Sequence, residues 1–287
     1  MTIQSVNKLT ALAIFDIDGV IRDVGGSYRR ALADTVEHLT DSAYRPSQDD
    51  IDVLKAEGVW NNDWEASQEL VFRYFEGHET EMPATQDTIW RDAAGRGGVA
   101  IAYDNLVAFF QSRYRGTDPN HFTGYICQEP LLLKREYLDS LTAAKIGWGF
   151  FSGATRKSAS YVLEKRLGLA APVLVAMEDA PGKPDPTGLF AAIAQVTPTS
   201  KIPVIYVGDT VADMYTVVNA RQQRSDRSWI AVGILPPHVQ ETESSRQQYL
   251  TTLKQAGADV VFSNVQELTP SAIAQLVLQR EEGRGKR

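Results

Sequence analysis

Two carboxylates follow directly after an apolar run near the start of the chain. Asp16 and Asp18 come at the end of residues 11–15, which are all apolar and too few for a stable isolated helix. Such a run is typical of a strand buried on both faces, in which side chains two residues apart point to the same side. Gly19 then allows a tight turn and a close approach of the backbone to a ligand. The segment predicts either paired acidic groups beside exposed N–H groups or Asx residues that bond locally to the backbone.

Three further polar clusters stand beside predicted strands later in the chain. They comprise Ser152 with Gly153, Lys183 before Pro184, and Asp209 with Asp213. Each has a structural explanation of its own, because a hydroxyl can begin a turn, a lysine can be a solvated loop charge, and carboxylates can cap a helix. In an open parallel sheet, however, ligands bind outside the carboxyl ends of the strands. The placement and order of the clusters therefore favour one shared site.

Four carboxylates gathered at one sheet edge would repel one another unless a cation lay among them. Lys183 supplies a single positive charge, which leaves negative charge in excess. Oxygen ligands without nitrogen or sulfur neighbours favour Mg²⁺, which proteins hold with carboxylates, waters and a substrate phosphate. A zinc site is not expected, because the histidines fall away from these clusters. They are His38, His78, His121 and His238.

The composition is that of an ordinary globular protein, with 43% hydrophobic and 23% charged residues in a chain of 287. No apolar run approaches the roughly 20 residues that span a bilayer, and the first residues do not resemble a signal peptide. Cys127 is the single cysteine and can form no internal disulfide. A net charge of −7 without a basic stripe argues against a nucleic-acid partner. We expect a cytoplasmic protein with neither a membrane nor a nucleic-acid partner.

Residues 24–124 carry helical apolar patterns and almost no strand-like runs. Helices are expected over 27–39, 47–58, 62–77, 85–94 and 104–114. Ser47, with Asp50 three residues later, resembles a capping box at one helix start. The sequence therefore predicts an all-helical domain here. We expect Arg22 and Asp23 to lie in the hinge that leads into it.

The remainder of the chain alternates strands with helices, which is typical of a parallel α/β sheet. Strands are expected over 11–15, 148–151, 173–177, 203–207, 229–235 and 259–262. Helices are expected over 131–145, 157–167, 186–194, 212–220 and 240–255. The predicted fold class is thus α/β, with a parallel-sheet core over 1–23 and 125–287 and an all-helical domain inserted over 24–124.

The four polar clusters resemble, in order, the four signature motifs of the haloacid dehalogenase (HAD) superfamily. The matching stretches are Asp16-Ile17-Asp18-Gly19-Val20, Ser152-Gly153, Lys183-Pro184, and Gly208-Asp209 with Asp213. The helical block resembles the C1-type cap of subfamily I, inserted after the first motif. As a set the motifs are specific, whereas any one alone is weak. The resemblance implies a Rossmann-like core and Mg²⁺-dependent phosphoryl transfer through an aspartyl-phosphate.

The resemblance also implies roles for the acidic residues. Asp16 would be the nucleophile and a Mg²⁺ ligand. Asp18 would protonate the leaving oxygen and then activate water, while its backbone carbonyl binds the metal. Asp209 would bind the metal directly, and Asp213 would act behind the ligands or through water. Family members that cleave carbon–halogen bonds lack the second acid, so Asp18 argues against a dehalogenase.

Phosphate-binding groups follow from the same comparison. The Ser152 hydroxyl and the backbone N–H groups near Gly19 and Gly153 would hold phosphoryl oxygens. Lys183 would neutralise charge between the nucleophile and the phosphate.

Substrate selection is expected from the inserted domain, because caps of this kind close over the core. Lys55, Asn62 and Trp64 lie in a polar, aromatic segment and are candidates to face the cleft. Alternatively, Asn62 or Asp63 caps a helix and Trp64 belongs to the core. Arg156 either contacts a second anionic group or simply lies on its helix.

The sequence thus predicts a Mg²⁺-dependent phosphatase acting on a small phosphorylated metabolite. A phosphomutase with the same motifs is the first alternative. A non-catalytic binding or regulatory protein is the second, although no motif carboxylate is missing.

Overall fold

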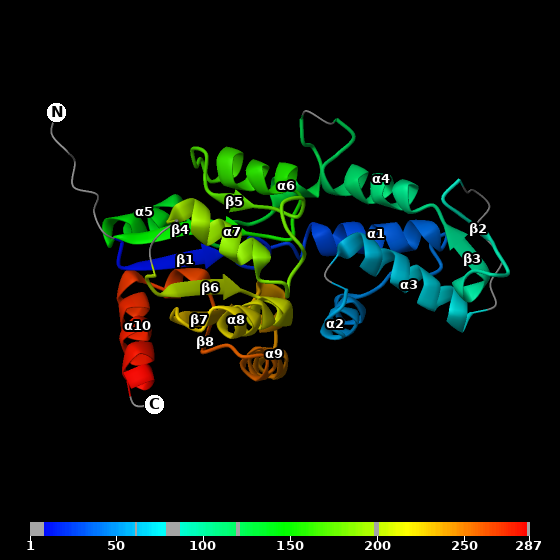
Figure 1. Cartoon of the computed structure of the whole chain (residues 1–287). Helices are drawn as coiled ribbons and strands as arrows, with labels where there is room; N and C mark the ends of the chain where they lie inside the picture. Colours follow the sequence, from blue (N-terminus) through cyan, green and yellow to red (C-terminus); the bar gives the residue numbers. More distant parts are fainter. Residues whose placement is uncertain (1–8, 61, 79–86, 119–120, 198–200, 286–287) are drawn as a thin grey trace. The chain divides into compact units, whose positions relative to one another are not determined.

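The computed structural model describes residues 9–60, 62–78, 87–118, 121–197 and 201–285. The chain forms two compact units, one of Met1–Asp23 with Pro130–Arg287 and the other of Val24–Glu129 (Figure 1). The second junction thus follows Glu129 rather than residue 124. The first unit is called the core unit below, and the second the insert.

A six-stranded parallel sheet lies at the centre of the described part of the core unit. Its order is β5-β4-β1-β6-β7-β8, and its strands are β1 (Ala11–Phe15), β4 (Ile146–Phe151), β5 (Leu174–Val175), β6 (Val204–Gly208), β7 (Trp229–Ile234) and β8 (Val260–Phe262). Every residue of β1 is buried, as expected for a strand covered on both faces. The predicted parallel α/β core is confirmed.

The strand register brings the predicted site segments to one edge of the sheet. Phe15, at the end of β1, pairs with Phe150 of β4 on one side and Val207 of β6 on the other. The chain adds β4 and β5 on one side of β1, then returns to place β6 on the other side. This reversal of strand order creates a switch point between β1 and β6, where ligands bind in open α/β sheets.

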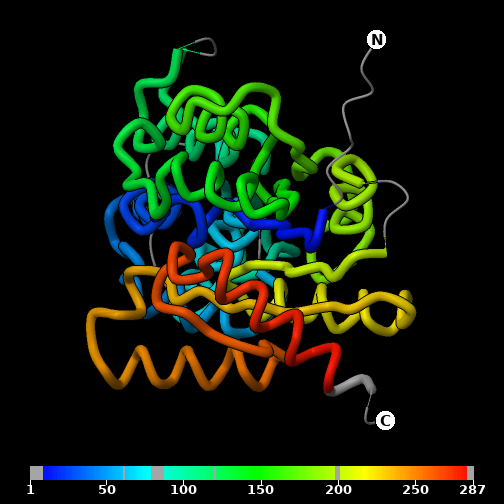
Figure 2. The backbone as a smooth tube through the Cα atoms, turned by 90° about the vertical axis from the view of Figure 1, so that its left-hand side faces the viewer, coloured from blue at the N-terminus to red at the C-terminus, as the bar shows by residue number. Residues whose placement is uncertain are grey.

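Helices cover both faces of this sheet. They are α5 (Arg135–Ala143), α6 (Arg156–Ser160) followed by a π-helical segment (Tyr161–Arg166), α7 (Thr187–Val196), α8 (Val211–Gln223), α9 (Glu243–Gln255) and α10 (Pro270–Gly285). Helices α7, α8 and α9 pack in one apolar cluster with Leu12, Ile14 and Tyr206. Tyr137 of α5 meets the Phe15 ring on the opposite face. Figures 1 and 2 show α10 beside the amino ends of the strands.

Backbone hydrogen bonds join the two segments that connect the core unit to the insert. The Asp23 N–H donates to the Pro130 carbonyl at 2.9 Å, and the Leu132 N–H donates to the Ile21 carbonyl at 2.8 Å. Arg22 and Leu131 form an antiparallel bridge between these contacts. Residues 130–132 therefore pair with the outgoing chain, and α5 begins at Arg135 rather than at the predicted residue 131.

The insert contains helices α1 (Tyr28–Leu39), α2 (Gln48–Ala56), α3 (Asp63–Gly77) and α4 (Tyr103–Tyr114). The predicted capping box is confirmed, because Ser47 and Asp50 cap the start of α2 reciprocally. Short 3₁₀ turns occur at Arg96–Gly98 and Tyr125–Gln128 in the insert, and at Pro237–Gln240 and Val265–Glu267 in the core unit.

The prediction of an all-helical insert is wrong at residues 85–94. Residues 85–86 lie outside the described part, and the chain then forms an antiparallel hairpin of β2 (Ile89–Arg91) and β3 (Val99–Ile101). Ile89 pairs with Ile101, and β-branched residues favour strands. Between the strands, Gly97 and Gly98 have φ of 61° and 71°, a left-handed conformation that glycine adopts without strain.

Helix α10 was not predicted. The Thr269 hydroxyl caps its first turn by accepting the Ala272 N–H at 3.2 Å, and Ile273 is buried. In the described residues, no helix combines the length and the apolar character needed to cross a bilayer.

Burial of β1 should dominate the stability of the core unit. Leu12 is fully buried, so Leu12→Ala is expected to lower the free energy of unfolding by about 2–5 kcal/mol. Leu278→Ala removes the same atoms from a side chain that is 59% exposed and should change it by less than about 0.5 kcal/mol. Urea unfolding of both variants tests this expectation, and equal losses would contradict it.

Candidate active site

Asp16 leaves the end of β1 while its backbone is still part of the sheet. Its N–H donates to the Val207 carbonyl at 2.8 Å, which fixes it beside β6. Its own carboxylate accepts the Ile17 N–H through Oδ1 at 2.7 Å. The side chain is only 7% exposed, so this carboxylate is held in place and largely removed from water.

Asp213 begins α8 and points back toward the sheet. Its Oδ2 accepts bonds from the Thr210 hydroxyl at 2.6 Å and the Thr210 N–H at 3.0 Å, while the Asp213 N–H donates to the Thr210 hydroxyl. This capping box confirms the helix-start role that the sequence left open. The close packing needs Gly208, because a Cβ there would lie 2.3 Å from the Cβ and Cγ of Asp213.

Lys183 bridges the loop that follows β1 and the first turn of α8. Its Nζ lies 2.6 Å from Asp16 Oδ2 and 2.6 Å from Asp213 Oδ1. The Tyr206 hydroxyl, buried under the site in β6, donates to the same Asp213 oxygen at 2.9 Å. Both oxygens of Asp213 are therefore occupied by protein donors.

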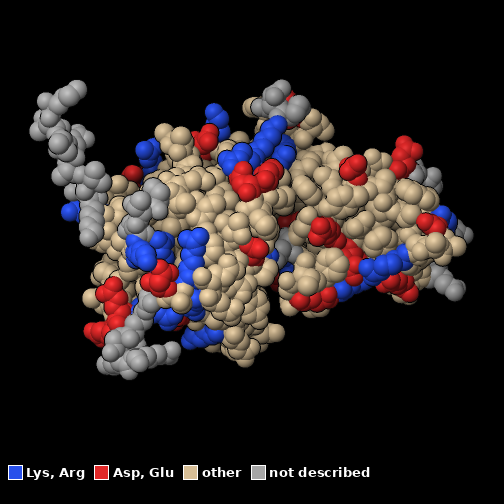
Figure 3. All heavy atoms as spheres, viewed as in Figure 1, with Lys and Arg blue, Asp and Glu red and all other residues tan. Residues whose placement is uncertain are grey.

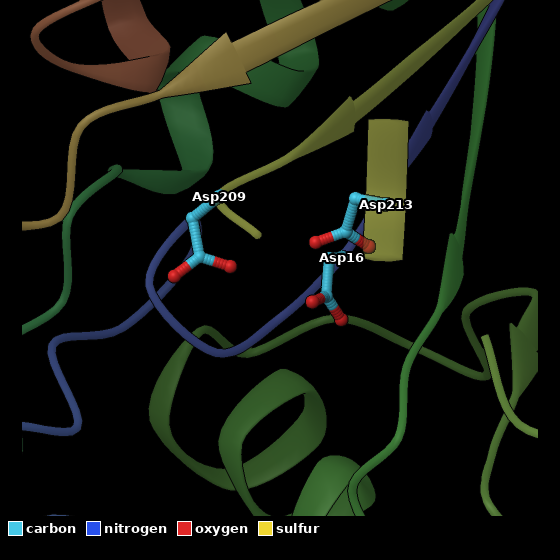
Figure 4. A group of neighbouring side chains, drawn as sticks. All are labelled: Asp16, Asp209 and Asp213. Carbon is cyan, nitrogen blue, oxygen red and sulfur yellow. The ribbon is translucent and has the colours of Figure 1, made fainter. Parts of the chain in front are cut away.

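Three carboxylates share one space at the edge of the sheet (Figure 4). Asp16, Asp209 and Asp213 each offer an oxygen within 4.8 Å of the others, and all three residues are buried. Gly19 makes room for Asp209, because a Cβ on Gly19 would lie 1.9 Å from Asp209 Oδ2. The Tyr249 hydroxyl, from α9, donates to the Asp209 carbonyl at 3.0 Å. These acids are three of the four residues predicted to bind the metal, and the fourth is Asp18.

The pKa values show that negative charge is crowded here. The pKa of Asp16 is raised to about 7: burial is the largest cause, Lys183 opposes it, and repulsion from Asp213 and Asp18 adds to the rise. Burial also raises the pKa of Asp209 well above its usual value, with repulsion from Asp213 and Asp16 adding to it.

The lysine and its second partner behave as an ion pair. Burial lowers the pKa of Lys183, but the Asp16 and Asp213 charges outweigh it and the net shift is upward. Burial likewise raises the pKa of Asp213, yet Lys183 and the Thr210 hydrogen bonds leave it below its usual value.

A divalent cation fits this donor set. The contributing groups are oxygen donors, the local charge is in excess of what Lys183 neutralises, and the space is narrow. Both oxygens of Asp213 accept protein donors, and both oxygens of Asp16 contact the Ile17 N–H or Lys183, so the direct metal ligands among these acids stay a prediction. Elsewhere on the face shown in Figure 3, basic and acidic side chains are interspersed in both units.

Asp18 lies beside this cluster and is partly exposed, with 30% of its side chain accessible. It forms an ion pair with Arg22, whose Nε donates to Asp18 Oδ1 at 2.6 Å. Arg22 is completely buried. The sequence predicted a hinge position for Arg22 and did not predict this contact.

Ser152 follows β4 and is buried, and its hydroxyl accepts the Ala154 N–H at 3.2 Å. The neighbouring Gly153 is exposed. The hydroxyl thus makes the local turn contact that the sequence also allowed. Its contact with phosphate, and those of the backbone N–H groups near Gly19 and Gly153, stay predictions. The N–H of Gly19 itself donates to the Arg22 carbonyl at 2.9 Å.

In the insert, Lys55 and Asn62 have structural partners. Lys55 Nζ lies 2.6 Å from Asp63 Oδ1 and donates to the Trp60 carbonyl at 3.3 Å. Asn62 caps α3 by accepting the Trp64 N–H at 3.0 Å, as the alternative interpretation expected. Trp64 itself is half-buried. Substrate contacts of these residues stay predictions.

Arg156, in the core unit, also has local partners. It forms an ion pair with Asp179, and its N–H donates to Glu178 Oε2 at 2.8 Å. A contact between Arg156 and a second anionic group of the substrate likewise stays a prediction.

Several contributors to the site escaped the sequence analysis. They are Arg22, Tyr206, Thr210 and Tyr249. Thr210 had a readable signal, since a threonine three residues before Asp213 is a capping-box pattern. Tyr206 looks in sequence like any aromatic residue of a buried strand, and only the fold shows where its hydroxyl points.

A model of the haloacid dehalogenase-like hydrolase family matches residues 10–220 of this chain. The chain belongs to that family. The match spans β1, the whole insert and the strands that carry Ser152 and Asp209. The resemblance drawn from the four motifs is thereby confirmed.

The chain is also similar to a curated protein of low sequence identity. An imidazoleglycerol-phosphate dehydratase from Phytophthora nicotianae is 27% identical over 255 residues, covering 87% of this chain and 49% of that protein. The chain thus spans about half the length of this curated relative.

Solved structures share the fold. A phosphonoacetaldehyde hydrolase-like protein from Oleispira antarctica has a TM-score of 0.65 at 15% identity, covering 99% of both chains. A phosphatase from Thermococcus thioreducens has a TM-score of 0.53 at 20% identity, covering 77% of this chain and 92% of the other.

Gly19→Ala tests the close approach of the two loops. Gly19 has φ of +71°, and its new Cβ would displace the Asp209 carboxylate, so the variant should lose most of its stabilisation by Mg²⁺. Gly182→Ala is the matched control, because nothing lies within 4 Å of its Cβ position. The thermal midpoint of each protein with and without Mg²⁺ is the measurement. An unchanged response in Gly19→Ala would contradict the expectation.

The pKa of Asp16 predicts a pH-dependent metal effect. Asp16 binds its proton more tightly in the folded protein than in the unfolded chain. Without metal, its contribution to the free energy of unfolding therefore falls as the pH rises from about 4 through about 7. A cation that binds the ionised carboxylate removes this loss. At about 100 times its Kd, Mg²⁺ should add about 2.7 kcal/mol, or roughly 5–10 °C in Tm.

We expect this Tm increase to be larger near about pH 8 than near about pH 5, because protons compete with the metal for Asp16 at the lower pH. Calorimetry at both pH values with and without Mg²⁺ tests it. Equal increases would show that Asp16 does not take part in metal binding.

Proposed function

We propose that the chain is a Mg²⁺-dependent phosphatase that hydrolyses a small phosphorylated metabolite. The observation that carries this proposal is the placement of Lys183 between Asp16 and Asp213, with Asp209 beside them at the switch point of the sheet. A buried lysine beside a carboxylate nucleophile is suited to a substrate that brings additional negative charge, as a phosphate does.

The proposed reaction has two steps. In the first, an Asp16 oxygen attacks phosphorus, the bond to the ester oxygen breaks, and a protonated Asp18 gives its proton to the leaving alkoxide. In the second, the Asp18 carboxylate takes a proton from water, whose oxygen attacks phosphorus and releases inorganic phosphate and free Asp16. Ser152 and backbone N–H groups near Gly19 and Gly153 hold the phosphoryl oxygens; the Gly19 N–H itself donates to the Arg22 carbonyl.

Asp16, Asp209 and the Asp18 backbone carbonyl would hold Mg²⁺, with Asp213 behind them. When bound, the metal neutralises charge on the carboxylates and on the phosphoryl group. Without such compensation, burial and mutual repulsion favour protonated Asp16 and Asp209.

A phosphomutase is the alternative within the same chemistry, because transfer from Asp16 to a second hydroxyl would replace transfer to water. Asp18 supports phosphate-ester chemistry over carbon–halogen cleavage, which needs no acid at this position. The name of the curated relative adds one candidate phosphomonoester, imidazoleglycerol phosphate, to those worth assaying.

The test is a screen of phosphorylated metabolites for phosphate release with Mg²⁺ present, including sugar phosphates and imidazoleglycerol phosphate. We expect release from at least one substrate and its loss in excess chelator. An isomerised sugar phosphate without phosphate release would favour the mutase. A substrate that loses water from its carbon skeleton but keeps its phosphate would favour a dehydratase.

Asp16→Asn and Asp18→Asn should each reduce turnover by at least about a thousandfold while the protein stays folded. Asp226→Asn is the matched control, since Asp226 is exposed and pairs with Lys201 on the surface, and it should keep full activity. Activity that survives in Asp16→Asn would remove Asp16 from the mechanism. Hydrolysis that survives chelation would exclude the metal.

A further inference from the structure

Arg22 is a completely buried arginine four residues beyond Asp18, in the segment that follows β1. Its Nε donates to Asp18 Oδ1 at 2.6 Å, and its Nη2 lies 2.5 Å from the same oxygen. Burying a guanidinium is costly unless it is paired. The contact with Asp18 joins this buried guanidinium to a carboxylate that is partly exposed.

The backbone of Arg22 is held from two sides. Its carbonyl accepts the Gly19 N–H at 2.9 Å, and its N–H donates to the Ile17 carbonyl at 3.2 Å. On the other side it forms the antiparallel bridge with Leu131. The guanidinium therefore starts from a fixed point, and its position relative to the Asp18 loop is set by the fold.

The Nε and Nη2 contacts with Asp18 use the same oxygen, Oδ1. Among the described residues, no donor contacts Oδ2 of this carboxylate. Oδ1 already accepts a charge-assisted hydrogen bond from the Arg22 Nε–H, so another group meets Asp18 more readily through Oδ2. That is the oxygen left available to a substrate.

We propose that Arg22 is a positioning residue for Asp18: it fixes the carboxyl group through Oδ1 and so presents Oδ2 as the oxygen that exchanges protons with the leaving group and with water. This inference rests on the proposed function. Arg22 acts through Asp18, and its contribution belongs to the proton transfer rather than to phosphate binding.

The leaving group distinguishes this role from a purely structural one. An alkyl phosphate releases an alkoxide that needs a proton as the bond breaks, whereas p-nitrophenyl phosphate releases a stable phenolate that needs none. The ratio kcat/KM reports transition-state stabilisation relative to the free enzyme and substrate. It therefore measures the step in which Asp18 acts as an acid.

We expect Arg22→Met to lower kcat/KM for the alkyl phosphate found in the screen about 10- to 100-fold more than for p-nitrophenyl phosphate, with KM changed by less than about threefold. Arg22→Lys should restore part of the loss, because it keeps one charged donor. Arg221→Met is the control: it removes a half-buried arginine of the core unit that likewise pairs with an aspartate, Asp259. This control should leave the ratio between the two substrates unchanged.

Equal losses on the two substrates would overturn the proposal. If Arg22→Met does not fold, Arg22→Lys carries the test, and a shift in the same direction but smaller is the supporting result. A crystal structure of either folded variant adds a measurement that needs no turnover. Displacement of the Asp18 carboxylate supports the proposal, and an unmoved carboxylate refutes it.

The wild-type protein separates this proposal from the proposed function. If it releases no phosphate from any phosphomonoester, the phosphatase assignment fails, and the role of Arg22 in proton transfer falls with it. If wild type is active and only the substrate ratio of Arg22→Met is unchanged, the phosphatase stands and the Arg22 proposal alone is wrong.

Discussion

One buried ammonium group holds the functional edge of this protein together. Lys183 lies 2.6 Å from two carboxylates, one in the loop that follows β1 and one in the first turn of α8. In a buried setting each such contact is strong, but each charge is also costly to leave without a partner. The two segments are therefore coupled: the position of Asp16 depends on Lys183, and the position of Lys183 depends on Asp213.

Asp213 shows how the same atoms serve fold and chemistry. One of its oxygens completes the cap of α8 with Thr210, and the other receives Lys183 and the Tyr206 hydroxyl. The helix start and the charged site thus share a residue. The interpretation of Asp213 as a helix cap and its interpretation as a site residue were posed as alternatives, and the cap contacts and the lysine contact occur together.

The parts of the fold that sequence predicts well are those with a strong local pattern. Residues 11–15 are continuously apolar and end in two acids, and β1 is found there. The prediction of a helix over 85–94 was wrong because this segment has few apolar residues and the glycines that follow it reverse the chain. Tertiary pairing of Ile89 with Ile101 then decided the structure, as is common for short segments.

The same distinction holds for the site. The motif residues are recognisable because their types and order are unusual, and Asp16, Lys183 and Asp213 do meet. Arg22, Tyr206 and Tyr249 act through atoms that reach a partner across space. Nothing in their local sequence marks that partner, because a buried tyrosine or an arginine near a junction is common in many proteins.

The paired segments at the junction have a consequence for how this chain could diversify. Ile21 and Asp23 are bonded to Leu132 and Pro130, so the two connections close on each other inside the core unit. Any sequence inserted between Asp23 and Pro130 therefore begins and ends at two backbone positions that are hydrogen-bonded to each other. With both ends of the insert fixed in this way, evolution or protein engineering could replace the whole insert while β1 keeps its register in the sheet.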